Sequence, residues 1–90
     1  MKIDYSRLQN HMQDCARRYI EHGISGGSFF TALVSNDLMG AFGRADEANI
    51  AAMRDWCGFL YNDAPSTCWG SPTKVDAWIA QGGMNKDQAT

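Results

Sequence analysis

Apolar residues recur every three or four positions in four separate segments of the sequence. This spacing places them on one face of an α-helix. It predicts helices over approximately residues 5–22, 28–43, 47–63 and 72–81. No segment shows the strict alternation of apolar and polar residues that is typical of a strand. The sequence therefore predicts an all-α fold, a compact bundle of about four helices.

Residues that start or stop helices separate these segments. Gly23 suits the left-handed end of the first helix, and Asp46 suits the cap of the third. Pro65 prevents the third helix from continuing. Ser71 followed by Pro72 is a strong start signal, because the serine oxygen can cap while proline fits the first helical position.

The length of 90 residues is sufficient for one domain. Apolar residues make up 44% of the chain and include three Trp, three Tyr and four Phe, which supply bulky core material. We therefore expect a single helical domain over residues 1–84. Residues 85–90 contain no large apolar side chain, and we expect a disordered tail there.

The charge of the chain bears on its possible partners. The formal net charge is −2, and Arg17-Arg18 is the only adjacent pair of cations. Binding to a nucleic-acid backbone needs several clustered Lys or Arg side chains, so direct nucleic-acid binding is disfavoured. No apolar run approaches the ~20 residues of a membrane span, and the N-terminus lacks the pattern of a signal peptide. The sequence predicts a cytoplasmic protein that does not enter a membrane.

The cysteine pattern argues against a disulfide framework and against a metal site. Cys15, Cys57 and Cys68 are an odd number of thiols on a chain without a secretion signal, which favours reduced cysteines. No two of them are close in sequence, and His11 and His22 share no ligand spacing with them. We expect no metal and no cofactor. No nucleophile with a neighbouring base is evident either, so the sequence predicts a protein that is not an enzyme.

Two polar residues interrupt the predicted apolar faces. On a helical wheel Asp37 falls within the apolar arc of the second helix, and Asn49 falls within that of the third. A buried carboxylate without a partner is costly. Asp37 could accept a hydrogen bond from Arg44, from a Trp indole or from a backbone amide at a helix start, or it could anchor a binding surface. Asn49 could bond back to Asp46 or to a loop carbonyl, or could meet Asp37 and fix the helix register.

The loop between Pro65 and Pro72 is rich in unusual residues for its length. Trp69 in this loop either seals the small core or serves as an exposed anchor for a partner. Cys68 has no histidine placed near it by sequence, and nothing in the pattern indicates a lowered thiol pKa. Catalysis by Cys68 is therefore disfavoured.

Four blocks of the sequence resemble a small family of accessory proteins of tailed phages and prophages. The blocks are residues 27–38 (GSFFTALVSNDL), 41–49 (AFGRADEAN), 60–66 (LYNDAPS) and 68–72 (CWGSP), in that order. The resemblance implies no reaction and no cofactor. The polar and aromatic residues of the blocks are the candidate binding residues: Asn36, Asp37, Arg44, Asp46, Asn49, Tyr61, Asn62 and Trp69.

The resemblance implies a context rather than a chemistry. Small accessory proteins of phages often bind and disable a host component. The leading hypothesis is accordingly a non-enzymatic binding protein that antagonises or modulates a host protein in the bacterial cytoplasm, as a counter-defence protein. One alternative is an oligomeric sponge for a nucleotide-derived immune signal, with arginine on phosphate and an aromatic ring on the base. The other is a structural homodimer closed by the first two helices.

Overall fold

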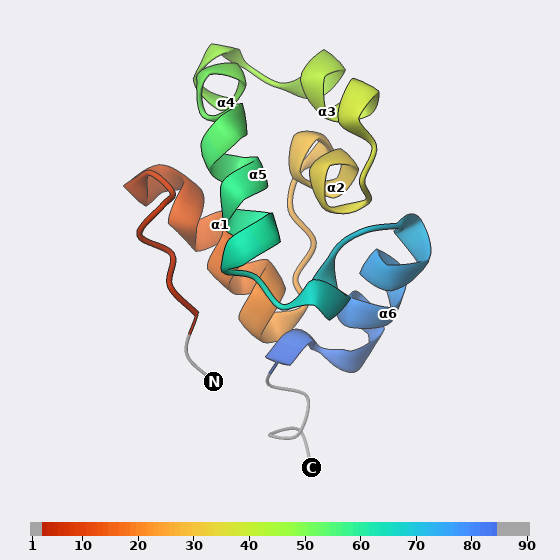
Figure 1. The fold of residues 1–90 in the computed structure, drawn as a ribbon. Helices are drawn as coiled ribbons and strands as arrows, with labels where there is room; N and C mark the ends of the chain where they lie inside the picture. Colours follow the sequence, from red (N-terminus) through yellow and green to blue (C-terminus); the bar gives the residue numbers. More distant parts are fainter. Residues whose placement is uncertain (1–2, 85–90) are drawn as a thin grey trace.

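The computed structural model describes residues 3–84, and these residues form an all-α domain without strands (Figure 1). The all-α prediction is confirmed. The predicted tail, residues 85–90, lies outside the described residues. Within residues 3–84 the α-helices are α1 (Asn10–His22), α2 (Ser28–Val34), α3 (Leu38–Arg44), α4 (Glu47–Ala51), α5 (Met53–Asn62) and α6 (Pro72–Gln81), and the 3-10 helix η1 (Ser66–Cys68) precedes α6.

The helix predicted over residues 28–43 is two helices, α2 and α3, so its continuity was predicted wrongly. The chain turns at Asn36, whose φ of 65° lies in the left-handed region that asparagine tolerates better than most residues. Asp37 then caps α3, since its Oδ1 accepts a hydrogen bond from the Gly40 amide at 3.0 Å. A polar residue with cap chemistry therefore ends one helix and starts the next.

The helix predicted over residues 47–63 also divides, at Ala52. The backbone of Ala52 departs from helical geometry, with a ψ of 6°, and separates the short α4 from α5. Asp46 caps α4 as predicted, because its Oδ1 accepts a hydrogen bond from the Asn49 amide at 2.8 Å. The first helix begins at Asn10, later than the predicted residue 5.

The core forms where α1, α2, α5 and α6 meet. Tyr19 of α1 contacts Phe30 of α2 edge to face at 5.2 Å, and Phe30 contacts Trp56 of α5 in the same way at 5.6 Å. Trp78 of α6 donates its indole N–H to the Tyr19 carbonyl at 3.0 Å in the buried interior. Such aromatic pairs contribute about 0.5–1.5 kcal/mol each beyond the area that they bury. They join four helices around one centre.

The ends of α1 and α6 meet through two glycines. Gly23 ends α1 with a φ of 70°, as the sequence predicted, and Gly83 follows α6 with a φ of 72°. A Cβ atom on Gly83 would lie 2.6 Å from the Gly23 nitrogen. Only glycine allows both the left-handed backbone and this close approach. The meeting of the two helix ends thus depends on residues without side chains.

The helices also bear on membrane insertion. None of those formed by residues 3–84 has both the length and the apolar character needed to cross a membrane.

Candidate functional site

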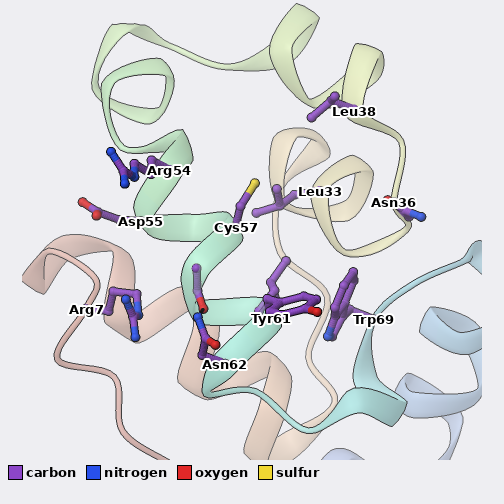
Figure 2. Close-up of a pocket in the computed structure, with 12 residues that line it drawn as sticks. Arg7, Leu33, Asn36, Leu38, Arg54, Asp55, Cys57, Tyr61, Asn62 and Trp69 are labelled. Atoms are coloured by element: carbon purple, nitrogen blue, oxygen red, sulfur yellow. Dashed lines mark hydrogen bonds between the residues drawn. The ribbon is translucent and has the colours of Figure 1, made fainter.

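A groove of about 590 Å³ crosses the outward face of α5 (Figure 2). We call it the α5 groove. Seven residues of α5 line it, and five of these recur at helical spacing: Arg54, Cys57, Gly58, Tyr61 and Asn62. Residues three or four apart share a face of a helix, so this set forms one stripe along α5. The stripe lies opposite the residues by which α5 joins the core.

The centre of this stripe is a dip at Gly58. The three atoms nearest to a Cβ placed there all belong to the side chain of Arg7, and its Cδ would lie 3.2 Å away. The Arg7 side chain therefore extends over the helix beside the glycine. Glycine is a poor helix former, costing about 1 kcal/mol relative to alanine. Here its lack of a side chain lets the Arg7 side chain lie close to the backbone of α5.

Trp69 borders the groove from the segment that follows η1. The residues on either side of it are held by the core, because the Cys68 carbonyl accepts a hydrogen bond from the Tyr19 hydroxyl at 2.7 Å and the Gly70 amide donates to the Val34 carbonyl at 2.8 Å. Trp69 itself is half-buried against the edge of the core and also lines the groove. Its packing against the core agrees with the predicted seal, and its role as an anchor for a partner stays a prediction.

The side chains of Tyr61 and Trp69 point toward each other from α5 and from the loop (Figure 2). Tyr61 is 81% exposed, a large fraction for an aromatic residue. Leu33 and Leu38 lie on the same side of α5 as Trp69, and Leu38 is 55% exposed. We call Leu33, Leu38 and Trp69 the apolar flank of the groove.

The opposite side of α5 carries charged residues (Figure 2). Arg7 forms an ion pair with Asp63, with its Nε 2.9 Å from Asp63 Oδ2. Arg54 is exposed and has no ion-pair partner within residues 3–84. Asp55 is exposed beside it. We call Arg7 and Arg54 the arginine flank, and Asp63 and Asp55 balance its charge.

The structure gathers four of the eight predicted site residues around the α5 groove: Asn36, Tyr61, Asn62 and Trp69. Asn36 occupies the turn between α2 and α3. Asn62 donates from Nδ2 to the Gly58 carbonyl at 3.0 Å, which stabilises the last turn of α5. The tyrosine and the tryptophan are thus the members of this set with the largest surface to offer a ligand.

Asp37 and Arg44 lie elsewhere, at a shallower hollow between α2, α3 and the start of α6. Asp37 is exposed and does not interrupt a buried apolar face, so the helical-wheel placement was wrong. The reason is the helix break before it, which rotates Asp37 out of the arc of α2. Its interpretation as an acceptor for a backbone amide at a helix start is confirmed by the bond from Gly40. Arg44 donates to the Gly40 carbonyl at 3.2 Å.

Asp46 and Asn49 are also away from the α5 groove, and both have structural partners. Asp46 caps α4, as described above. The Asn49 Oδ1 accepts a hydrogen bond from the Trp56 indole at 3.1 Å. Asp37 and Asn49 therefore bond to different groups, and the predicted hydrogen-bonded contact between them is not formed. Asn49 keeps the buried Trp56 N–H satisfied.

Sequence reasoning missed three residues that shape the groove. Arg7, Arg54 and Gly58 were not among the predicted site residues. Arginines on an outer helix face give no distinctive signal in the sequence. Gly58 could have been noticed, because a glycine within a strongly periodic helix often marks a close approach or a functional surface.

The chemistry of the cysteines does not point to a nucleophile. Cys68 is completely buried, and this burial raises its pKa to about 12. A thiol with such a pKa stays protonated near neutral pH, whereas thiolate is the reactive form. Burial also raises the pKa of Cys15. Among residues 3–84, His, Cys, Asp and Glu side chains form no group of three that could hold a metal ion.

Comparison of the chain with protein-family models, with curated proteins and with solved structures finds no match. The resemblance to the phage accessory family therefore stays a prediction from the four sequence blocks.

Proposed function

We propose that this protein is a non-enzymatic accessory protein of a phage or prophage that binds a host protein and antagonises or modulates it, in the role of a counter-defence protein. The observation that carries the proposal is the α5 groove, where a mostly exposed Tyr61 faces a Trp69 fixed on a rigid loop. Energetically important residues of protein interfaces are enriched in Trp, Tyr and Arg. The groove combines all three types.

Exposed apolar residues of α3, the helix that contributes Leu38 to the groove, also favour a protein partner. On α3, Leu38, Met39 and Phe42 are 55%, 83% and 43% exposed. Large apolar side chains gathered in solvent commonly mark an interaction surface. The only residue of α3 that is buried is Ala41. The helix thus contributes more to the surface than to the core.

A pull-down with matched variants tests the proposal. The tagged wild-type protein, Tyr61→Ala and Ile24→Ala are expressed in the bacterial host and crosslinked, and captured proteins are quantified. Ile24 is the control because it is 53% exposed and does not line the groove. We expect one host protein to be captured by wild type and control and to fall about tenfold or more with Tyr61→Ala, since central aromatic residues contribute ~2 kcal/mol or more. Equal capture by all three would overturn the proposal.

A nucleotide-like ligand is the second candidate, and it rests on the position of two arginines. Arg44, the arginine among the predicted site residues, lies away from the groove, whereas Arg7 and Arg54 line the groove on the side of α5 opposite Trp69. Aromatic stacking with arginine on phosphate is a common way of binding nucleotides. A thermal-shift screen with cyclic dinucleotides and cyclic ADP-ribose isomers tests it. A stabilised protein that loses the shift on Arg54→Glu supports this candidate, and a flat screen excludes it.

A homodimer closed by the first two helices is less well supported. The apolar residues of α1 and α2 are used within one chain, where Tyr19 and Phe30 contact each other in the core. Little of their apolar surface is left for a second copy. Light scattering measures the oligomeric state directly.

A further inference from the structure

We infer that the α5 groove takes one aromatic side chain of the partner protein, which lies on the apolar flank against the rings of Tyr61 and Trp69. The inference rests on the proposed function, because it names the type of residue that the host protein would insert. Three observations support it: the two rings have no ring partner in this chain, the Trp69 indole has no acceptor, and the surface beside them is apolar.

The rings of Tyr61 and Trp69 are without ring contacts of their own. In the core, by comparison, Phe30 contacts both Tyr19 and Trp56. Within residues 3–84 neither Tyr61 nor Trp69 makes such a contact, although the two side chains point toward each other (Figure 2). Aromatic rings in contact gain energy beyond the area that they bury. A third ring placed against these two would gain it, whereas an aliphatic side chain would gain the area alone.

The indole N–H of Trp69 is also free to bind a partner. The indole of Trp56 donates to the Asn49 Oδ1 at 3.1 Å, and that of Trp78 donates to the Tyr19 carbonyl at 3.0 Å. The Trp69 indole has no acceptor within residues 3–84, and its nitrogen is not buried. An indole nitrogen donates and does not accept. A hydroxyl or a backbone carbonyl next to the inserted ring would satisfy it.

The surface beside the two rings suits an uncharged side chain. Leu33 and Leu38 lie on the same side of α5 as Trp69 (Figure 2). The charges of the arginine flank, on the other side, are balanced by Asp63 and Asp55. No net charge of the groove therefore favours an anionic or a cationic side chain, and burial of apolar area favours an apolar one.

The apolar surface of α3 favours an aromatic residue of a protein over a free aromatic molecule. Leu38 lines the groove, and Met39 and Phe42 of the same helix are exposed. A small molecule on the apolar flank would leave those side chains in water. A protein that inserts one aromatic residue can cover them as well.

Peptide selection with matched substitutions on both partners tests the inference. Random linear peptides are displayed and selected against the wild-type protein, and the affinities of the selected peptides are measured. In the peptide, cyclohexylalanine in place of the aromatic residue keeps the volume and removes the π system. In the protein, Tyr61→Leu removes the ring and Tyr61→Phe keeps it. Tyr61 is mostly exposed, so both variants should fold, and Ile24→Ala outside the groove is the control.

We expect the selected peptides to share one Phe, Tyr or Trp. Cyclohexylalanine in the peptide and Tyr61→Leu in the protein should each weaken binding about threefold or more. The two changes together should weaken it by less than the product of the single effects, because both remove the same ring contact. Tyr61→Phe and Ile24→Ala should change the affinity less than about twofold, since one keeps the ring and the other lies outside the groove.

Other results would overturn the inference. Peptides that need the Tyr61 side chain but are anchored by Leu, Ile or Met would do so, as would peptides that bind equally well with cyclohexylalanine. Peptides that bind Tyr61→Ala as tightly as wild type would do so too. The proposed function is decided separately by the pull-down of the host protein, where capture must depend on Tyr61 whatever residue the partner inserts.

Discussion

The inward and outward faces of α5 differ in solvent exposure and in the types of residue that they carry. Trp56, Phe59 and Leu60 on the inward face are 2%, 0% and 5% exposed, and Phe59 stacks on Tyr5 at 5.6 Å. The outward face presents Tyr61, which is 81% exposed, together with Gly58 and Arg54. The burial of apolar surface in the core explains why the inward face carries these residues. Nothing in the folding of a single chain requires an exposed aromatic ring beside a glycine, so the outward face is where selection for binding would act.

The largest expected effect comes from truncating one aromatic residue on each face. Phe59→Ala should lower the free energy of unfolding by about 3–5 kcal/mol, because it leaves a cavity in the core. Tyr61→Ala should change it by no more than about 0.5 kcal/mol, since the ring is mostly in solvent. Urea unfolding of both variants measures the difference. Similar losses of stability would show that Tyr61 supports the fold, and the contrast between the faces would fail.

Thiol reactivity gives a second contrast between surface and core. Cys57 on the outward face is exposed, whereas Cys68 is buried with a raised pKa. An aromatic disulfide reagent at pH 8 should modify Cys57 about a hundredfold faster than Cys68, because exposure and thiolate fraction act together. Kinetics with peptide mapping measure this ratio. In denaturant the two rates should become similar, and equal rates in the native protein would contradict the burial of Cys68.

The smallest expected effect comes from filling the dip in the outward face. Gly58→Ala should raise stability by up to about 1 kcal/mol, since alanine favours helix and the Arg7 side chain can yield by a few tenths of an ångström. The same substitution should lower the capture of the host protein in the pull-down, because the displaced Arg7 side chain lines the groove. Gly43→Ala in α3 is the matched control, because a Cβ there meets nothing within 4 Å. Unchanged binding by Gly58→Ala would show that the dip is not used.

The fold class followed from apolar spacing, but the number of helices did not. Periodicity identified every segment of residues 3–84 that forms an α-helix, and Gly23, Asp46 and Ser71 correctly marked helix ends. It could not detect the break at Asn36, because residues on both sides of the break continue an apolar pattern. The break depends on a single left-handed residue and on the cap that Asp37 provides. Cap chemistry within a predicted helix was the relevant signal, and it was interpreted as a misplaced carboxylate.

The candidate site was predictable only in part, for a related reason. Tyr61 and Trp69 stood out as aromatic residues of the family blocks, and the structure places both at the groove. Arg7 precedes α1 in the sequence and lines the groove. It becomes a neighbour of Gly58 only in the folded structure. One sequence without related sequences holds no signal for such a pair. Asp46 and Asn49 were chosen as candidates because they are polar. In the structure Asp46 caps α4, and Asn49 accepts a hydrogen bond from the Trp56 indole.

Tyr19 has a consequence for the order in which the domain can form. Its hydroxyl bonds to a residue 49 positions later, and its carbonyl bonds to a residue 59 positions later. During synthesis α1 leaves the ribosome long before these partners exist. These two hydrogen bonds can therefore form only after η1 and α6 have been made, and contacts of such long sequence separation are slow to close. Trp69 is set in place by the same late step, so the groove would be among the last features of the molecule to mature.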